Sequence, residues 1–303
     1  MSAASSRTRH PREILVAGAT GHQGGAVAQS LLKRGFTVRG LSRDPSKKPE
    51  GLDSRIKWVR GDLHDAGSLE SALRGADGFY VVTTPFAGGW GKPPDIEGEI
   101  RAGTVALETA KRLKIPHVVL SSIRGVGEAS QPIGVPHFDS KMKIEQLARS
   151  LGVPITFVRP SYFMENLFQP WTLQAFRAEV ISVPIKPGTK IPMVAVRDIG
   201  EIVARAFEQP ERRIGTGVDL QGDEKTYPEI VELISRRLGT HARFVEMSDH
   251  DALQQLGEDM QRMYRAFDYG GYGVDVAALE REWNIKMTRF EDLLKETELQ
   301  KAD

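Results

Sequence analysis

From Glu13 onwards the chain alternates between short apolar runs and longer amphipathic segments. The short runs are rich in β-branched and aromatic residues, whereas the longer segments repeat apolar residues three and four positions apart. This alternation is typical of a parallel sheet whose strands are joined by crossover helices. We therefore predict an α/β fold with a Rossmann-type, doubly wound parallel sheet. The predicted strands cover 14–18, 37–43, 56–62, 78–83, 117–122 and 155–160, and the predicted crossover helices cover 25–35, 68–75, 99–113 and 141–152.

The pattern loosens after Pro160. A Pro/Gly-rich stretch over 181–194 is predicted to be a loop, the segment 196–210 a helix, and 217–239 one more strand and helix. The tail from His241 is largely helical in pattern. These elements predict a smaller C-terminal α/β domain on the substrate side.

The same patterns predict how the chain is divided. We expect 13–160 to form the Rossmann domain and 161–303 the smaller domain, with 190–210 packing back on the Rossmann domain. The residues at 1–12 are small, polar and basic without an apolar stretch, which predicts a disordered N-terminal lead.

A glycine-rich turn joins the first predicted strand to the first predicted helix. Gly18, Gly21 and Gly24 are spaced three apart in this turn. Glycines at this place permit a tight turn, close approach of a pyrophosphate to the backbone, and close packing of helix on strand. The helix N-terminus then faces the negative phosphates. The turn therefore predicts a bound dinucleotide, with contacts from Gly18, Ala19, Thr20, Gly21, His22, Gln23 and Gly24.

The end of the second predicted strand indicates which dinucleotide binds. An acidic residue at this point bonds the ribose 2′-hydroxyl of NAD, whereas basic residues suit the 2′-phosphate of NADP. Here Arg43 follows the strand, and Lys47 and Lys48 come within one turn. We therefore predict NADP(H) as the cofactor. Asp44 leaves an alternative open, because it would serve NAD if its side chain pointed inward and that of Arg43 outward.

The third and fourth predicted strands also end in residues suited to a cofactor. Asp62 and Leu63 close the third strand, where a carboxylate and an apolar side chain can flank the adenine. Thr83 and Thr84 close the fourth, at the carboxyl edge where a dinucleotide crosses a parallel sheet. Strand-end capping and turn formation explain the same residues equally well.

Five sequence motifs together resemble one family. They are GATGHQGG at 18–25, SRDPSKK at 42–48, HFDSK at 137–141, RPSYFMEN at 159–166 and VRDIG at 196–200. With them the chain resembles, over nearly its whole length, the NmrA-like family of atypical short-chain dehydrogenases, and within it the HSCARG type of NADP(H)-binding redox sensor. HFDSK and FMENL are fairly specific, whereas GxxGxxG and VRDIG occur in many short-chain dehydrogenase relatives.

The resemblance implies a set of cofactor contacts. It places the glycine turn on the pyrophosphate, Arg43 and Lys47 on the 2′-phosphate, and Lys141 on the nicotinamide ribose. It also implies that Arg101 is a basic residue near the cofactor. The remaining implied contacts are Thr83 and Thr84 near the middle of the cofactor, and the backbone from Phe163 to Asn166 at the nicotinamide.

The chain departs from the short-chain dehydrogenase pattern at the proton donor. These enzymes usually pair a tyrosine with a lysine four positions later, and the lysine lowers the pKa of the phenol. In this chain His137 stands four positions before Lys141, so the usual acid is missing. An imidazole titrates near neutral pH, which makes His137 a candidate replacement, and Tyr162 is a second. Both also suit a purely structural role, and Ser121 or Ser122 is the candidate for the serine partner.

Composition and charge exclude several classes of function. The 303 residues include no cysteine, which removes disulfides, thiolate metal sites and cysteine nucleophiles. The seven histidines never occur at HxH, HxxxH or HExxH spacing, so no metal site is predicted. A formal net charge of +1 gives no reason to expect nucleic acid or an anionic membrane as a partner. With no signal peptide and no run of about 18 apolar residues, we expect a cytoplasmic protein.

Two hypotheses of function follow. The first is a redox sensor that responds to the NADPH/NADP ratio and contacts a regulatory protein partner, through a change of conformation or of oligomeric state such as a homodimer. The second is an NADPH-dependent oxidoreductase of a quinone, enone, imine or aromatic small-molecule substrate that lacks the usual tyrosine acid. The resemblance and the missing tyrosine favour the sensor. The loop over 87–95 around Trp90 is a candidate lid over the cofactor.

Overall fold

The computed structural model describes residues 12–47, 51–89, 92–127, 131–178, 180–269 and 273–299. Lys48 and Trp90 lie outside these residues, and of the expected lead only Arg12 is described. The guanidinium of Arg12 lies 5.0 Å from the centre of the Phe36 ring. In the part of the chain that the structure describes, no helix combines the length and the apolar character needed to cross a bilayer.

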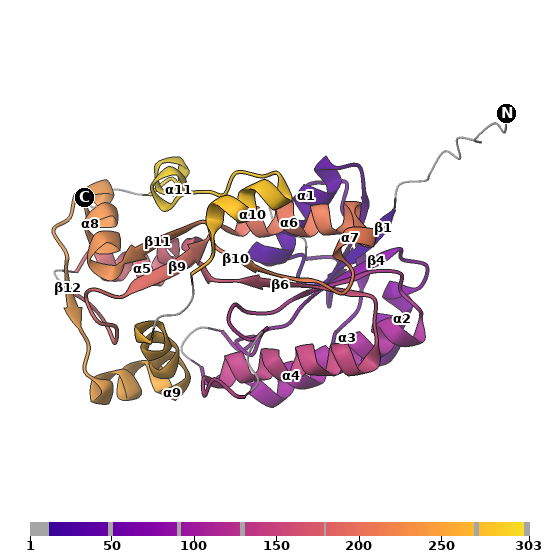
Figure 1. Ribbon diagram of the computed structural model, residues 1–303, viewed down its shortest axis with the longest axis horizontal. Coiled ribbons are helices and arrows are strands. Elements are labelled where there is room, and N and C mark those ends of the chain that lie inside the picture. Colours follow the sequence, from indigo (N-terminus) through magenta and orange to yellow (C-terminus); the bar gives the residue numbers. More distant parts are fainter. Residues whose placement is uncertain are drawn as a thin grey trace.

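A seven-stranded parallel sheet runs through the molecule (Figure 1). In order across the sheet its strands are β10 (Gly217–Leu220), β6 (Ile155–Pro160), β5 (Val118–Ser121), β4 (Gly78–Val82), β1 (Glu13–Val16), β2 (Thr37–Ser42) and β3 (Lys57–Arg60). The strand order reverses between β1 and β4, which makes this the switch point of a doubly wound sheet. Each of the six predicted strands is present. The seventh, β10, comes from the C-terminal half and pairs with β6.

Both faces of this sheet are buried, as is usual for parallel strands. In β1, Ile14 and Val16 point into one core and Leu15 into the other. A Cβ on Gly200 would lie 2.6 Å from the carbonyl oxygen of Ala26, so glycine allows close packing of two of the covering helices. The two closely packed helices are α1 (His22–Lys33) and α6 (Val196–Glu208), which cover one face of the sheet. The other face is covered by α2 (Ala66–Leu73), α3 (Ile96–Arg112) and α4 (Pro136–Leu151) (Figure 1).

The remaining elements include two small sheets. One has the order β11 (Asp223–Thr226), β9 (Lys190–Val194) and β7 (Tyr162–Phe163), and the other pairs β12 (Arg243–Glu246) with β8 (Val180–Val183). The remaining helices are η1 (Met164–Phe168), α5 (Pro170–Phe176), α7 (Pro210–Arg213), α8 (Tyr227–Leu238), α9 (Asp249–Asp268), α10 (Val276–Trp283) and α11 (Phe290–Glu296).

The prediction of a loop over 181–194 is wrong. This stretch contains most of β8 and all of β9. Ile181, Ile191 and Met193 are buried in a third apolar core, between the small sheets and α8. Burial of these side chains therefore outweighs the tendency of the neighbouring prolines to break strands.

Candidate functional site

The glycine turn lies at the carboxyl end of β1, beside the switch point. Gly18 has a φ of +64°, a left-handed conformation that favours glycine. A Cβ on Gly24 would lie 2.2 Å from the carbonyl oxygen of Gly18, so only glycine lets α1 lie this close to the turn. Gly21 is the N-cap of α1, and no side chain caps this helix end. The positive end of α1 is therefore available to an anionic group such as a pyrophosphate.

The other residues of the turn divide between the core and the surface. Ala19 is buried, whereas Thr20 and His22 are exposed. Gln23 is buried, and its Nε2 donates to Oγ of Ser121 at 2.7 Å. This hydrogen bond ties the start of α1 to the end of β5.

The loop after β2 presents Arg43 rather than Asp44. The amide and hydroxyl of Ser46 donate to Oδ1 of Asp44 at 3.1 and 2.5 Å, and the hydroxyl contributes most to lowering the pKa of this carboxyl. Lys47 is exposed, with Nζ 3.5 Å from Oδ2 of Asp44. Arg43 is exposed and has no ion-pair partner among the described residues. The geometry therefore favours a 2′-phosphate at Arg43 over a ribose hydroxyl at Asp44.

Three residues predicted to contact the cofactor do not line the cavity at the carboxyl ends of β4, β5 and β6. Oδ1 of Asp62 accepts from the amide of His64 at 2.9 Å, and Leu63 packs partly buried against α2 and its core. Arg101 is exposed on α3, with its guanidinium 3.9 Å from Oδ2 of Asp95. Cofactor contacts of Asp62, Leu63 and Arg101 stay predictions.

Lys141 lies at the centre of a buried polar network. Its Nζ donates to the carbonyl oxygen of Thr83 at 2.6 Å and to the Thr83 hydroxyl at 3.0 Å, and lies 2.8 Å from Oε1 of Glu99. The fully buried Glu99 carboxylate also accepts from the hydroxyls of Thr83 and Ser140. Each of the three ammonium hydrogens thus has an acceptor, which compensates for the cost of burying the charge. The sequence did not predict Glu99, because one acidic residue in an amphipathic helix carries no distinct signal.

His137 forms a second buried pair, one helical turn before Lys141 on α4. Its Nδ1 lies 2.7 Å from Oδ2 of Asp259, and its backbone N–H donates to Oδ1 of Asp259 at 2.9 Å. Asp259 comes from α9, 122 residues along the chain. The edges of the Phe86 and Phe138 rings contact the imidazole, with centroids 5.5 and 4.7 Å away. His137 and Lys141 share one face of α4, because residues four apart lie above one another on a helix.

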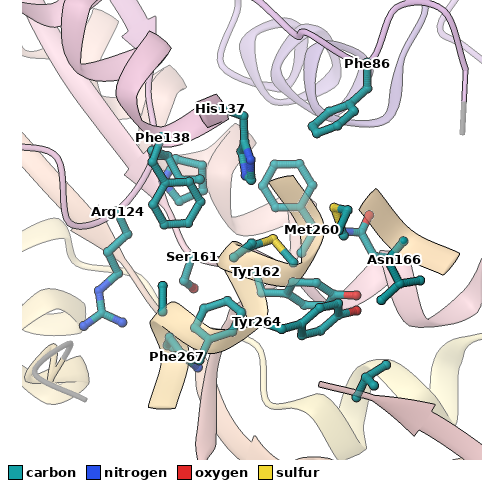
Figure 2. A pocket seen from close by; sticks show the side chains of 18 of the residues that line it. Phe86, Arg124, His137, Phe138, Ser161, Tyr162, Asn166, Met260, Tyr264 and Phe267 are labelled. Atoms are coloured by element: carbon teal, nitrogen blue, oxygen red, sulfur yellow. The ribbon is translucent and has the colours of Figure 1, made fainter. Parts of the chain in front are cut away.

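A cavity of about 580 Å³ lies between the carboxyl ends of β4, β5 and β6 and helix α9 (Figure 2). Most of its lining side chains are apolar, and its volume is typical of a site for a small organic molecule. Figure 2 shows the His137 ring pointing into the space that Met260 and Tyr264 border. The predicted site residues that line the cavity are Gln23, Thr83, Thr84, His137, Lys141, Tyr162, Phe163 and Asn166.

Helix α9 forms one wall of this cavity. Gly257, with a φ of +80°, interrupts the helix. After this interruption, Met260, Met263 and Phe267 line the cavity at intervals of three and four residues, so they share one face of α9, and Leu256 before the interruption lines it as well. The wall is therefore apolar and, through its methionines, adaptable in shape.

The three tyrosines of the cavity are Tyr162, Tyr227 and Tyr264. The hydroxyls of Tyr227 and Tyr264 lie 3.2 Å apart. Burial, followed by the neighbouring Tyr264, raises the pKa of Tyr162 well above its ordinary value of 10.0. A tyrosine acid of the short-chain dehydrogenase type needs the opposite shift. Tyr162 is therefore better suited to contact a substrate than to act as the acid, and its catalytic role stays a prediction.

Two serine hydroxyls in the cavity wall lack a protein partner. The Oγ atoms of Ser122 and Ser161 are buried and accept or donate no hydrogen bond within the described residues. Ser121, the other candidate serine, is engaged with Gln23. Buried hydroxyls are nearly always hydrogen-bonded, so these two are exceptions, and neither Oγ has surface open to the cavity. Over the described ranges, no group of three or more His, Asp or Glu side chains is placed to hold a metal ion.

Comparison with known proteins extends over nearly the whole chain. The sequence profile of the NmrA-like family matches residues 10–299. The NmrA-like family domain-containing oxidoreductase himF of Aspergillus japonicus is 27% identical over 275 residues, which cover 84% of this chain and 81% of himF. NAD(P)H azoreductase of Xenophilus azovorans is 27% identical over 251 residues, which cover 80% of each chain.

Solved structures share the fold. NADPH-dependent quinone oxidoreductase QOR2 of Escherichia coli, complexed with NADPH, has a TM-score of 0.78 at 20% identity and covers 93% of this chain and 99% of its own. Triphenylmethane reductase of Citrobacter sp., complexed with NADP(H), has a TM-score of 0.76 at 17% identity. The match covers 94% of this chain and 99% of the reductase. NmrA, a negative transcriptional regulator in complex with NADP, has a TM-score of 0.72 at 19% identity. The match covers 95% of this chain and 96% of NmrA. The predicted Rossmann-type fold is confirmed, and the predicted cofactor agrees with those of these structures.

Proposed function

The chain belongs to the NmrA-like family, and we propose that it is an NADPH-dependent reductase of an apolar, conjugated small molecule such as a quinone, enone, imine or aromatic azo compound. The observation that carries this proposal is the cavity of about 580 Å³ beside Thr83 and Lys141. It lies at the carboxyl edge of the sheet, where a dinucleotide crosses a Rossmann fold. Sensing of the cofactor alone gives no reason for such an apolar space.

The turn and the loop after β2 fit NADP(H). The space beside Gly24 admits no Cβ, and the positive end of α1 is uncapped. We assign the pyrophosphate to the turn from Gly18 to Gly24 and the 2′-phosphate to Arg43. Bound NADPH supplies the hydride.

The side chains of the cavity orient the substrate and exclude water. The apolar α9 wall covers apolar rings of the substrate. Lys141, fixed by Glu99 and Thr83, places a positive charge at the wall without a change of side-chain position. Exclusion of water strengthens each of these polar interactions.

A redox sensor is the second candidate function. The observation that favours it is His137 in the place of the tyrosine acid, together with the likeness to the fold of NmrA, a negative transcriptional regulator. In this case NADPH and NADP would both bind without turnover. The oxidation state of the bound cofactor would then alter homodimer formation or the contact with a regulatory protein partner.

Oxidation of NADPH, followed at 340 nm against a panel of quinones, enones, imines and azo compounds, separates the two. The reductase predicts turnover faster than about 1 per second with at least one of them. Met260→Trp should fill the cavity and abolish turnover while NADPH still binds. Leu253→Trp is the matched control, because Leu253 is on α9 but 49% exposed and outside the cavity lining. No turnover on any compound, with an oligomeric state that differs between NADPH and NADP, would support the sensor instead.

A further inference from the structure

We propose that His137 and Asp259 form a proton-donating dyad, in which Asp259 positions the imidazole that protonates the substrate. This inference rests on the reductase function proposed above. Hydride addition to one end of a C=O, C=C–C=O, C=N or N=N group leaves negative charge on an oxygen or nitrogen. That atom needs a proton, and the usual tyrosine donor is replaced in this chain.

The geometry fixes which nitrogen of His137 faces the ligand. An ionised carboxylate only accepts hydrogen bonds, and both oxygens of Asp259 accept from His137, one from the backbone and one from Nδ1. Nδ1 therefore carries a hydrogen, and the two bonds hold the ring at two points. No described residue bonds Nε2, while the ring lines the cavity (Figure 2). Nε2 is thus the atom that can give a proton to a bound molecule.

Burial makes the carboxylate necessary for this role. The side chains of His137 and Asp259 are 9% and 6% exposed. A positively charged imidazole at such a position, away from water, is stable only beside an opposite charge. Asp259 supplies that charge at 2.7 Å. The edges of Phe86 and Phe138 restrict rotation of the ring, so the donor is oriented before a substrate arrives.

Lys141 is less suited to this step. Its ammonium hydrogens already meet two oxygens of Thr83 and one of Glu99. Loss of a proton from Nζ would leave the Glu99 carboxylate buried without a positive partner. The contacts of Lys141 therefore suit a positioning role, whereas Nε2 of His137 faces the cavity without a partner among the described residues.

The proposed step balances as follows. The substrate accepts a hydride from NADPH, and the electron pair of its double bond moves to the adjacent or conjugated oxygen or nitrogen. The Nε2–H bond of the His137 imidazolium breaks, and the proton goes to that atom. The neutral imidazole keeps the Nδ1–H bond to Asp259, and Nε2 regains a proton from solvent after product release.

The dyad forms only where α9 packs against the start of α4. A second contact joins the same two segments, from Nη1 of Arg262 to the carbonyl oxygen of Gly134 at 2.9 Å. Arg262 is half exposed and contributes no side chain to the cavity. Arg262→Gln is therefore the matched control, because it removes one link between α9 and the α4 start and leaves the dyad intact.

Two kinds of hydride acceptor test the proton donor. An azo compound and an enone need a proton, whereas a triarylmethyl cation dye becomes neutral on accepting hydride and needs none. We expect His137→Gln to lower the ratio of azo or enone turnover to dye turnover by about 100-fold, and Asp259→Asn by about tenfold or more. Arg262→Gln should leave this ratio within about twofold of the unmodified protein. Equal loss on all acceptors, or the same loss in Arg262→Gln, would overturn the dyad in favour of a structural role.

A spectroscopic readout tests the dyad independently of turnover. Long-range ¹H–¹⁵N NMR of the neutral imidazole should show the hydrogen of His137 on Nδ1, and Asp259→Asn should move it to Nε2, because an amide NH₂ facing Nδ1 needs an acceptor there. A hydrogen on Nε2 in the unmodified protein would overturn the dyad. If no acceptor is reduced at all, the proposed reductase fails, and this measurement still accepts or rejects the positioning role of Asp259.

Discussion

The cofactor end and the substrate end of this site are built in different ways. The glycine turn occupies seven consecutive residues, from Gly18 to Gly24, and works through backbone geometry. The cavity instead collects side chains from α4, α9 and the ends of three strands, and its His137–Asp259 pair spans 122 residues. Substitutions in the turn should therefore alter cofactor affinity, whereas substitutions in the cavity should alter turnover.

Lys141→Met removes the ammonium group of the cavity wall that pairs with Glu99. It leaves the fully buried Glu99 carboxylate without its positive partner, and we expect the free energy of unfolding to fall by about 3–5 kcal/mol. Urea denaturation measures this. The double variant Glu99→Leu/Lys141→Met should recover most of the loss, because an apolar pair replaces the ion pair. An equal loss in both variants would contradict the importance of the pair.

His117 makes the sheet acid-sensitive at a place remote from both ends of the site. Burial, and then the charge of Arg12, lowers its pKa from 6.5 to about 4. The folded protein thus prefers neutral His117, so stability is full above pH 6.5 and is lost as the pH falls towards 4. The loss is about 3 kcal/mol, because the pKa of His117 is 6.5 in the unfolded chain and about 4 in the folded protein. Urea denaturation at several pH values should show it, and a His117→Gln variant with the same acid loss would exclude this residue as its source.

Gly24→Ala tests whether the turn acts through its backbone. The added Cβ would lie 2.2 Å from the carbonyl oxygen of Gly18, which forces α1 away from the turn. A strain of about 1–3 kcal/mol corresponds to a roughly 5- to 150-fold higher Kd for NADPH. Calorimetric titration measures it. Gly188→Ala is the control, since a Cβ there meets open space; unchanged affinity in Gly24→Ala would disprove the backbone role.

Arg43→Ala, compared with Arg101→Ala, tests which of these two basic residues binds the 2′-phosphate. We expect the Kd for NADPH to rise by about tenfold while that for NADH stays constant, because only NADPH carries the 2′-phosphate. Arg101→Ala should change neither Kd, since Arg101 is exposed and faces Asp95. The opposite ranking of these two variants would place the phosphate near α3.

Residues that act locally could be predicted from the sequence. Glycines spaced along one strand–turn–helix unit and an apolar alternation identify the sheet, its order of elements and the phosphate turn. Asp259 could not be predicted, because nothing in its local sequence distinguishes it from the other acidic residues of a solvated helix. Its role appears only when α9 meets α4.

Two further features also depend on tertiary packing. Arg101 lies on the exposed side of α3, and Glu99, two positions earlier, is buried, a distinction that depends on how the helix is rotated against the sheet. Strands β8 and β9 escaped prediction because burial in a tertiary core outweighed the prolines and the glycine of the stretch 181–194. Local pattern thus predicted the parallel sheet well, whereas the small sheets and the His137–Asp259 contact depend on tertiary packing.

Transfer of deuterium from C4-deuterated NADPH to a product tests directly whether the cavity is the site of reduction. With an enone or imine acceptor, in which the hydride goes to carbon and the new C–D bond does not exchange with water, we expect a reduced product that carries one deuterium from one face of the cofactor, detected by mass spectrometry. Met260→Trp should prevent this transfer while NADPH still binds, and Leu253→Trp should permit it. Bound NADPH that gives no deuterium to any acceptor, or transfer that persists when the cavity is filled, would contradict the assignment of this cavity as the site of reduction.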